Sequence, residues 1–387
     1  MKSILITGSA GFIGANLVMR LLRDMTEGTI IGLDNLNNYY DVSLKEYRLK
    51  ELDTYYSQLS NSPLPLNSKP STLNYQFVRG SIADKELVNK LFAENQFDIV
   101  VNLAAQAGVR YSIENPDAYI ESNIIGFYNI LEACRHSKDV IAGPHCGPHR
   151  GLDPRSHTYK GVQHLVYASS SSVYGGNTKV PFSIDDNVDH PVSLYAATKK
   201  SNELFAHCYS KLYDIPTTGL RFFTVYGPAG RPDMAYFGFT NKLLKGETIQ
   251  IYNYGNCRRD FTYVDDIVEG VVRVMKKAPK TKVPEPVKGP TTTLSTAPYA
   301  IYNIGGGQPE NLLDFVQILQ EELVRAGVLP KDYDFEAHKQ LVPMQPGDVP
   351  TTYADATALE RDFGFVPKTT LREGLRRFAA WYKEYYG

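Results

Sequence analysis

The sequence has little of several features that mark particular classes of protein. Four cysteines among 387 residues are too few for a disulfide framework, so we expect reduced thiols and a cytoplasmic location. The 41 basic and 42 acidic residues leave a net charge of −1, without the basic excess of a nucleic-acid-binding protein. The apolar run Ile4–Ile6 ends near Gly8 and is too short for a signal peptide or a membrane span. These absences favour an enzyme that acts on neither nucleic acid nor a membrane.

Short apolar runs alternate with amphipathic stretches over the first 222 residues. The runs are too short for helices, whereas the stretches between them follow the 3.6-residue period of a helix. Buried strands joined by helices form parallel sheets with right-handed crossovers, so the pattern predicts an α/β protein with a Rossmann-type, doubly wound parallel sheet. The predicted strands are 3–7, 29–33, 75–79, 98–103, 163–168 and 217–222, and the clearest helices are 87–95, 118–137 and 194–213.

The alternation weakens after residue 222, where strand and helix patterns mix. We expect residues 1–222 to form the large domain, to which 264–277 and 300–305 return, and residues 223–387 to form mainly a smaller α+β lobe that binds the substrate. Prolines, glycines and polar residues in three segments predict surface loops, the last of them mobile. These segments are 54–74, 139–161 and 278–299.

A glycine-rich turn follows the first predicted strand and opens the first helix. Its sequence is Gly8-Ser-Ala-Gly11-Phe12-Ile13-Gly14. Glycines let the backbone approach a pyrophosphate closely, and the free N–H groups of the helix N-terminus face the negative charge. Asp34 lies twenty residues after Gly14, at the end of the second predicted strand and next to Asn35. A carboxylate there accepts both ribose hydroxyls of an adenosine and repels a 2′-phosphate, so NAD is predicted rather than NADP.

A tyrosine and a lysine stand four residues apart at the start of a predicted helix, as Tyr195 and Lys199. This spacing puts both side chains on one face, where an ammonium can lie beside a phenol. A phenol ionises near pH ~10, and a nearby cation lowers that value. The phenolate can take a hydroxyl proton while hydride leaves the same carbon. Such pairs also arise by chance on half-exposed helices, so this pair needs support from elsewhere in the sequence.

Four consecutive serines supply that support at the end of the fifth predicted strand, within Ala168–Gly175. Ligands of doubly wound sheets gather at the carboxyl ends of strands. Hydroxyls there can hydrogen-bond a reacting alcohol or ketone. Serines also form turns, but a turn seldom places four of them directly after a buried strand. We therefore predict a catalytic site built from this strand end and the Tyr195–Lys199 pair.

With TGxxGxxG, SSSSVYG and YxxxK in this order, the chain resembles the extended short-chain dehydrogenase/reductase family of nucleotide-sugar enzymes over nearly its whole length. The resemblance implies that Ser170, Tyr195 and Lys199 are catalytic and that Ser171 is their neighbour on the substrate side. It also implies a set of residues that line or support the NAD site. These are Gly8, Gly11, Phe12, Ile13, Gly14, Asp34, Asn35, Ile82, Asp84, Leu103, Ala104, Ala105, Gln106, Asn123 and Ser169, together with Tyr195 and Lys199.

Within that family, segments 38–49, 107–116 and 224–235 are most similar to UDP-glucuronate 4-epimerases, and 344–350 agrees. The resemblance implies epimerisation of UDP-glucuronate to UDP-galacturonate through a 4-keto intermediate, with NAD retained as a cofactor. A carboxylate beside C4 calls for a hydroxyl and a guanidinium in the pocket, for which Thr224 and Arg231 are the candidates. The full set of predicted UDP-sugar contacts is Arg110, Ser170, Ser171, Phe223, Thr224, Arg231, Arg259 and Asp348.

Some features leave alternatives open. Ala229 stands where the subgroup often has a tryptophan, which can loosen the pocket wall. A 4-epimerase of a neutral UDP-hexose or UDP-N-acetylhexosamine is the principal alternative, and a non-catalytic NAD-binding module is an alternative from another class. A 4,6-dehydratase is disfavoured because Ser171 and Ser172 stand where that group carries Asp-Glu. A decarboxylase is disfavoured because its characteristic substrate segments are not recognisable.

Two predictions concern partners and metals. The predicted helices 118–137 and 194–213 carry more apolar surface than one sheet face needs, and relatives pair these helices into a four-helix interface, so a homodimer is expected. Five of the eight histidines fall between His136 and His164, a stretch that also contains Cys146. Their spacing matches no common zinc site and the family's chemistry needs no metal, so we expect none.

Overall fold

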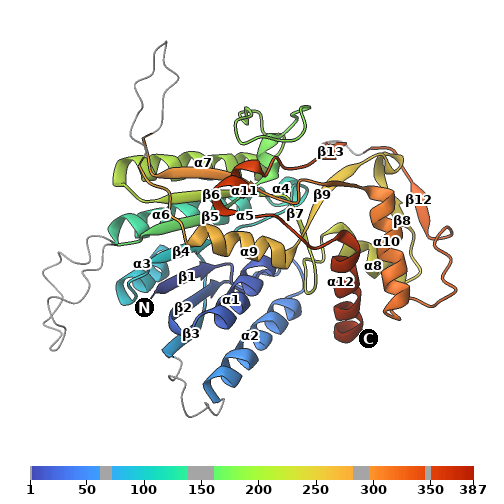
Figure 1. Ribbon diagram of the computed structural model, residues 1–387, viewed down its shortest axis with the longest axis horizontal. Helices are drawn as coiled ribbons and strands as arrows, with labels where there is room; N and C mark the ends of the chain where they lie inside the picture. Colours follow the sequence, from blue (N-terminus) through green and yellow to red (C-terminus); the bar gives the residue numbers. More distant parts are fainter. Residues whose placement is uncertain (1, 62–71, 138–160, 282–295, 345–349) are drawn as a thin grey trace, which may run out of the picture.

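The computed structural model describes residues 2–61, 72–137, 161–281, 296–344 and 350–387. Its centre is a seven-stranded sheet in the order β10-β6-β5-β4-β1-β2-β3, in which all neighbouring strands are parallel (Figure 1). The first six strands follow the doubly wound 3-2-1-4-5-6 order. The predicted Rossmann-type fold is therefore confirmed. The strands are β1 (Ser3–Thr7), β2 (Glu27–Asp34), β3 (Thr72–Arg79), β4 (Ile99–Asn102), β5 (His164–Ser170), β6 (Thr217–Phe222) and β10 (Tyr299–Ile304).

Helices cover both faces of this sheet, because successive side chains of a strand point to opposite sides. Ile4 and Ile6 of β1 belong to the core beneath α1, α2 and α9, whereas Leu5 belongs to the core beneath α3, α6 and α7. Central strands buried on both faces explain the continuous apolar runs in the sequence. The helices are α1 (Phe12–Asp24), α2 (Ser43–Asn61), α9 (Val264–Met275), α3 (Lys85–Glu94), α6 (Phe127–His136) and α7 (Leu194–Tyr213).

The structure differs from the sequence predictions at two places. The predicted loop 54–74 was wrong at both ends, because α2 continues to Asn61 and β3 begins at Thr72. Tyr55, Tyr56 and Leu59 continue the helical spacing after buried Leu52 and pack against the core, which extends the helix. The predicted helix 118–137 is composite: α5 (Pro116–Tyr119) leads into a π-helical turn, Ile120–Gly126, before α6.

The smaller α+β lobe follows β6 directly and is also confirmed. It contains a four-stranded sheet and a two-stranded sheet, against which α8, α10 and α12 pack. The helix α11 packs on β10 and α9, and α4 precedes α5. The elements of the lobe are β7 (Thr224–Tyr226), β9 (Arg258–Tyr263), β11 (Pro309–Asn311), β13 (Thr351–Thr352), β8 (Ile249–Ile251), β12 (Lys339–Leu341), α8 (Ala235–Leu244), α10 (Leu312–Arg325) and α12 (Leu371–Tyr386). The helix α11 comprises Thr357–Phe363, and α4 (Tyr111–Glu114) lies outside the lobe, after β4.

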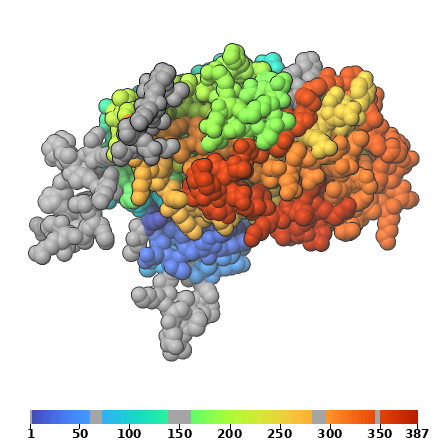
Figure 2. All heavy atoms as spheres, turned by 45° about the horizontal axis from the view of Figure 1, so that its top comes forward, coloured from blue at the N-terminus to red at the C-terminus, as the bar shows by residue number. Residues whose placement is uncertain are grey.

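A second connection joins the large sheet to the C-terminal part of the chain. The segment after β5 pairs with residues 353–355: Phe182 N donates to Tyr353 O at 3.0 Å, and Asp355 N donates to Phe182 O at 2.9 Å. Figure 2 shows this segment in green beside the red C-terminal residues. The large sheet and the C-terminal part of the chain are thus held together near the carboxyl ends of β5 and β6. No helix of the described ranges is both long and apolar enough to cross a membrane.

Candidate active site

The glycine turn between β1 and α1 forms a tight backbone cradle with no room for a side chain at Gly8 or Gly14. Gly8 has φ +71°, and a Cβ on it would lie 2.8 Å from Ala104 N. A Cβ on Gly14 would collide with the Gly8 carbonyl. Helix α1 begins at Phe12 without a side-chain cap, so the N-terminal N–H groups, with Ile13 among them, have no side-chain acceptor. Backbone N–H groups around such a cradle fit a pyrophosphate.

Asp34, at the end of β2, is held in place beside this turn. Its Oδ2 accepts from Ala10 N at 3.1 Å and its Oδ1 from Leu36 N at 2.9 Å. The neighbouring Asn35 is exposed, and its side chain accepts from Asn37 N. Both Asp34 oxygens keep a further lone pair with which they can accept ribose hydroxyls. The chemistry of this position therefore fits the adenosine half of NAD.

The loop after β4 is fixed by side-chain amides and hydroxyls. Thr7 Oγ1 donates to Asn102 Oδ1 at 2.7 Å and accepts from Ala104 N at 3.1 Å. Asn123, in the π-helical turn, accepts from Gln106 N at 2.8 Å and donates to Gln106 O at 3.0 Å. Its Nδ2 also lies 3.0 Å from Thr198 Oγ1 of α7. These hydrogen bonds connect the loop after β4 to α7, the helix that carries Tyr195. The loop contains Leu103, Ala104 and Ala105, which are half-buried and were predicted to line the NAD site.

The two residues predicted at the adenine lie after β3. Ile82 is buried, 4% exposed, and packs against Gly126 of the π-helical turn. Asp84 is exposed, and its Oδ1 accepts from Leu87 N at 3.0 Å as the N-cap of α3. The Asp84 carboxylate therefore already has a structural partner. Its contact with the adenine stays a prediction.

The structure brings the three predicted catalytic side chains to the end of β5 and the first turns of α7. Ser193 caps α7, which places Tyr195 in its first turn. Lys199 Nζ donates to Ala168 O at 2.8 Å, and burial lowers the Lys199 pKa to about 8. Burial raises the Tyr195 pKa, and the groups that oppose this rise are the Ser170 hydroxyl and the Arg231 charge. The spacing predicted that Lys199 would also lower the Tyr195 pKa; its ammonium donates to the strand, and its effect on Tyr195 stays a prediction.

Ser170 Oγ is oriented by the turn that follows β5. It accepts from Ser172 N at 3.2 Å and from Ser172 Oγ at 2.9 Å. Ser171 opens the same turn and is half-buried. The proton of Ser170 is left to donate, which fits the lowering effect of this hydroxyl on the Tyr195 pKa. A hydroxyl presented in this way can hold a sugar oxygen beside Tyr195.

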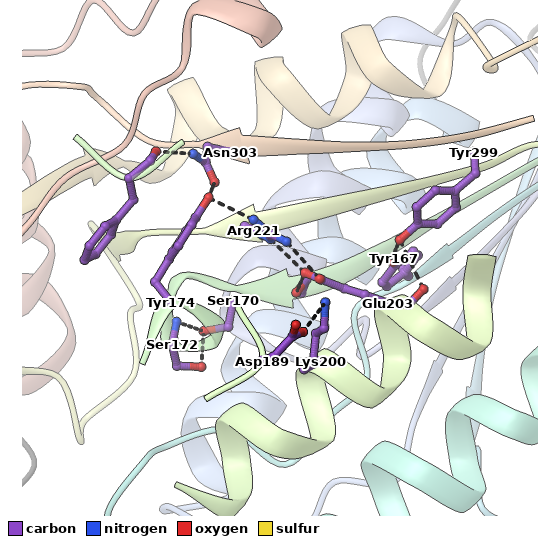
Figure 3. Close-up of polar contacts among 12 residues, drawn as sticks. Tyr167, Ser170, Ser172, Tyr174, Asp189, Lys200, Glu203, Arg221, Tyr299 and Asn303 are labelled. Carbon is purple, nitrogen blue, oxygen red and sulfur yellow. Dashed lines mark hydrogen bonds and ion pairs between the residues drawn. The ribbon is translucent and has the colours of Figure 1, made fainter. Parts of the chain in front are cut away.

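A buried ion pair that sequence reasoning missed lies behind these residues. Figure 3 shows Glu203 of α7 and Arg221 of β6 pointing toward each other, with two bonds of 2.8 and 2.9 Å. Both side chains are almost fully buried, 3% and 4% exposed. Ser169 Oγ donates to Glu203 Oε1 at 2.7 Å, so this hydroxyl is used in the network, and the predicted cofactor contact of Ser169 stays a prediction. A charged residue within the apolar run 217–222 was the available signal.

The network continues from Arg221 toward β10. Arg221 NH1 donates to the Tyr174 hydroxyl at 3.0 Å, which in turn donates to Asn303 Oδ1 at 2.6 Å (Figure 3). Asn303 Nδ2 then donates to Phe182 O at 2.7 Å. The strand end that carries Ser170 is therefore connected by side chains to α7, β6 and β10. Such a network restrains the catalytic groups relative to one another.

A second cluster of polar side chains surrounds Arg231. Its Nε and NH2 donate to the two oxygens of Asp233 at 3.0 and 2.5 Å. The Tyr39 hydroxyl donates to Asp233 at 3.1 Å, and the Arg231 guanidinium lies 5.9 Å from the Tyr39 ring centre. Burial, with Asp233 beside it, raises the Tyr39 pKa to about 12. Ring contacts lead from Tyr39 through Tyr111 and Tyr119 to Tyr195, with ring centres 4.7, 6.3 and 5.9 Å apart, so this cluster is connected to the predicted catalytic residues.

Neither Tyr39 nor Asp233 was among the predicted site residues. The signal for both was present, because they lie in the segments 38–49 and 224–235 that carry the resemblance to the uronate epimerases. The two segments meet here although 194 positions separate their residues. Only the fold brings them together.

The remaining predicted substrate residues are placed along β7, β9 and α4. Phe223 is buried against Tyr174 and Phe182, with ring centres 6.3 and 6.4 Å away, and Thr224 opens β7. Arg259 NH1 donates to Pro350 O at 3.1 Å. The Arg110 guanidinium lies 5.6 Å from the Tyr252 ring centre, next to the smaller lobe. Asp348 lies outside the described residues.

Among the residues that the structure describes, no group of three or more His, Cys, Asp and Glu is placed to hold a metal ion. Most of the histidine-rich stretch, including His145, Cys146 and His149, lies outside those residues. The described site thus combines hydroxyls, carboxylates, guanidinium groups, the Lys199 ammonium and backbone N–H groups.

Comparison with known proteins agrees with this geometry. The model of the NAD dependent epimerase/dehydratase family matches residues 4–305. The chain belongs to this family. Among its epimerase/dehydratase relatives, Protein CapI of Staphylococcus aureus is 47% identical over 383 residues, with 99% of both chains covered. UDP-glucuronate 4-epimerase 4 of Arabidopsis thaliana is 42% identical over 389 residues, covering 99% of this chain and 76% of the relative.

A solved structure of an epimerase is similar to this chain over nearly its whole length. It is UDP-glucuronic acid 4-epimerase from Bacillus cereus in complex with UDP-glucuronic acid and NAD, with a TM-score of 0.73, 28% identity and 99% of both chains covered. NAD is thus the cofactor of this epimerase/dehydratase, as predicted. The glycine cradle and Asp34 fit that cofactor.

Proposed function

We propose that this enzyme interconverts UDP-glucuronate and UDP-galacturonate by 4-epimerisation. The observation that carries the proposal is the guanidinium of Arg231, which lies 5.9 Å from the Tyr39 ring centre, while ring contacts through Tyr111 and Tyr119 join Tyr39 to Tyr195. A sugar whose C4 hydroxyl meets Tyr195 directs its C5 substituent to the same neighbourhood, so a carboxylate there would meet a cation. The relatives from Arabidopsis thaliana and Bacillus cereus act on this sugar by name, which supports the assignment.

We propose a division of labour along the chain. Residues 1–222 hold NAD through the glycine turn, Asp34 and the loop after β4, and residues 223–387 provide most of the UDP-sugar contacts, including Arg259. Bound NAD supplies a nicotinamide that accepts a hydride from the sugar and gives it back. Because it is regenerated in each cycle, the reaction needs no added oxidant or reductant.

The chain's own residues handle the proton and the carboxylate. Tyr195 takes the C4 hydroxyl proton and later returns it, while Ser170 holds the same oxygen by a hydrogen bond. Lys199 orients the strand end through Ala168 and supplies a positive charge beneath the site. The 4-keto sugar is a β-keto acid and loses carbon dioxide easily. Contacts from Thr224 and Arg231 keep its carboxylate out of the geometry that favours this loss.

One observation favours the alternative, a 4-epimerase of a neutral UDP-hexose. Asp233 already binds two nitrogens of Arg231, which lowers the net charge that a substrate would meet. A neutral sugar would need no free cation at this position. The neutral and acidic sugars must therefore be compared directly.

The test is to incubate the protein, without added NAD, with UDP-glucuronate, UDP-glucose and UDP-N-acetylglucosamine in separate reactions. Products are identified by proton NMR. The proposal expects UDP-galacturonate from the first sugar, with at least about tenfold lower kcat/KM for the other two, because a charge-assisted contact is lost. Faster turnover of a neutral sugar would favour the alternative, and no turnover of any sugar would favour a non-catalytic NAD-binding module.

We further propose that the chain forms a homodimer through the π-helical turn, α6 and α7. Large apolar side chains remain exposed along these elements in the single chain, which supports a covered face. They are Ile125, Tyr128, Leu204, Phe205 and Leu212. Light scattering at micromolar concentration should give twice the chain mass, and Leu204→Glu should reduce it. A monomeric mass for the unmodified protein would contradict the dimer.

A further inference from the structure

Arg48, on α2, is a buried cation whose hydrogen bonds all go to neutral oxygens. It is 3% exposed. Its five N–H groups match five contacts: Nε and NH2 with Ala229 O at 2.9 and 2.7 Å, NH2 with Gly230 O at 3.0 Å, and NH1 with Ala10 O at 2.9 Å and the Tyr40 hydroxyl at 2.8 Å. A buried charge is costly unless its hydrogen-bonding groups are satisfied. This guanidinium therefore holds its oxygens firmly.

The carbonyls that Arg48 holds belong to two loops with different tasks. Ala10 lies in the glycine turn that fits the NAD pyrophosphate, and its own N–H donates to Asp34. Ala229 and Gly230 immediately precede Arg231 in the connection between β7 and α8. One side chain thus joins the cofactor turn to the loop that carries the predicted carboxylate-binding cation, across 181 positions of sequence.

The conformation of the second loop needs such support. Ala229 has φ +50°, in the left-handed region that a residue with a Cβ seldom adopts. Gly230 has no room for a side chain, because a Cβ there would collide with the Tyr236 hydroxyl. Two guanidinium nitrogens on the Ala229 carbonyl hold this strained peptide in one orientation. The direction in which Arg231 leaves the backbone depends on that orientation.

We propose that Arg48 is a positioning residue that sets Arg231 against the cofactor turn and thereby determines the preference for an acidic sugar. The proposal rests on the proposed function for the identity of that sugar. The contacts of Arg48 are with Ala10, Tyr40, Ala229 and Gly230, so the proposed effect on the choice of sugar passes through the loop that carries Arg231. A lysine cannot replace it, because an ammonium has neither the planar geometry nor the five donors.

The first measurement follows the loop itself and needs no substrate. Hydrogen exchange is recorded on the NAD-loaded protein for wild type, Arg48→Met, Arg48→Lys and the control Arg23→Met, which removes an exposed arginine from neighbouring α1. In both Arg48 variants the amides of 229–234 should exchange about tenfold faster or more, because the anchor of the loop is lost. Exchange in β1 and β4 and in the control should stay unchanged. Unchanged exchange at 229–234 in folded Arg48→Met or Arg48→Lys would overturn the proposal.

The second measurement asks whether Arg48 acts through Arg231. Binding of UDP-glucuronate and UDP-glucose is measured by calorimetry in a Tyr195→Phe background, which prevents turnover, for Arg48→Met, Arg231→Ala and the double variant. Arg48→Met should reduce the preference for UDP-glucuronate about tenfold, and in the double variant it should add less than about twofold to the loss from Arg231→Ala. If the double variant lost preference for UDP-glucuronate by the product of the two single losses, the residues would act independently and the proposal would be overturned.

The two measurements distinguish a failure of the proposed function from a failure of the proposal for Arg48. If the Tyr195→Phe protein with Arg48 and Arg231 intact shows no preference for UDP-glucuronate, the proposed function fails. The exchange result for 229–234 then still decides whether Arg48 positions the loop.

Discussion

The two sides of the candidate site are held in different ways. On the side of Tyr195, the pair Glu203–Arg221 is 3% and 4% exposed and connects four elements of the large sheet. On the side of Arg231, the pair with Asp233 is 24% and 30% exposed and connects two loops. Breaking a buried pair leaves an uncompensated charge, whereas a partly exposed pair exchanges partners at low cost. The Tyr195 side is therefore held rigidly, whereas the Arg231 side can exchange the partner of its guanidinium more easily.

The largest expected effect is on the chemistry of the Tyr195 side. Tyr195→Phe keeps the ring and removes the acid/base oxygen, so turnover should fall by about two to four decades while NAD content stays unchanged. Steady-state kinetics and NAD released on denaturation measure both. Tyr209→Phe is the matched control on α7, because its hydroxyl binds Glu132 away from the site. Near-normal turnover of Tyr195→Phe would show that another group moves the proton.

The next effect is on stability. Arg221→Met leaves Glu203 buried without its cation, which should reduce the free energy of unfolding by about 3–5 kcal/mol. Denaturant unfolding of the NAD-loaded protein measures the loss. Lys179→Met removes the exposed partner of Asp186 and should leave the unfolding midpoint nearly unchanged. If both substitutions reduced the free energy of unfolding equally, the buried ion pair would be no more important for stability than the surface pair.

A smaller effect is expected on the Arg231 side, for recognition of the sugar carboxylate. Arg231→Ala should lower kcat/KM for UDP-glucuronate by about one to two decades, because a charge-assisted contact contributes about 1.5–3 kcal/mol. UDP-glucose, if turned over, should lose less. Release of a decarboxylated UDP-4-keto-pentose should rise, and mass spectrometry detects it. Equal losses on both sugars without this product would mean that Arg231 does not bind the carboxylate.

The smallest effect concerns pH. Burial lowers the Lys199 pKa to about 8, so its ammonium is complete only below that pH and is lost as pH rises through it. We expect kcat/KM to decline above pH 8 as the positive charge disappears. Lys199→Arg keeps the charge and should shift the decline to higher pH at whatever activity it retains. A profile that stays flat above pH 8 would show that the charge of Lys199 does not assist turnover.

The sequence predicted the large sheet well because its signals are local. Strands 3–7 and 217–222 and helix 194–213 match β1, β6 and α7 to the residue, since a buried strand or an amphipathic helix is visible within one window. The glycine turn and Asp34 carry the NAD prediction in the same way. The boundary at residue 222 stays a prediction.

The contacts that hold the site together could not be predicted from such windows. Glu203 meets Arg221 only because α7 packs beside β6, and Arg48 meets Ala229 across 181 positions. Their partners are often backbone carbonyls, which have no sequence signature. The hydrogen bond from Lys199 to the Ala168 carbonyl likewise follows from packing and has no signature in the i, i+4 spacing.

The most direct test of 4-epimerisation uses UDP-glucuronate labelled with deuterium at C4. If the carbon–hydrogen bond at C4 is broken and remade within one closed site, the UDP-galacturonate formed in ordinary water should keep the deuterium at C4. Proton NMR and mass spectrometry read the label at that position. Loss of the label to solvent, or the absence of any UDP-galacturonate, would contradict the account.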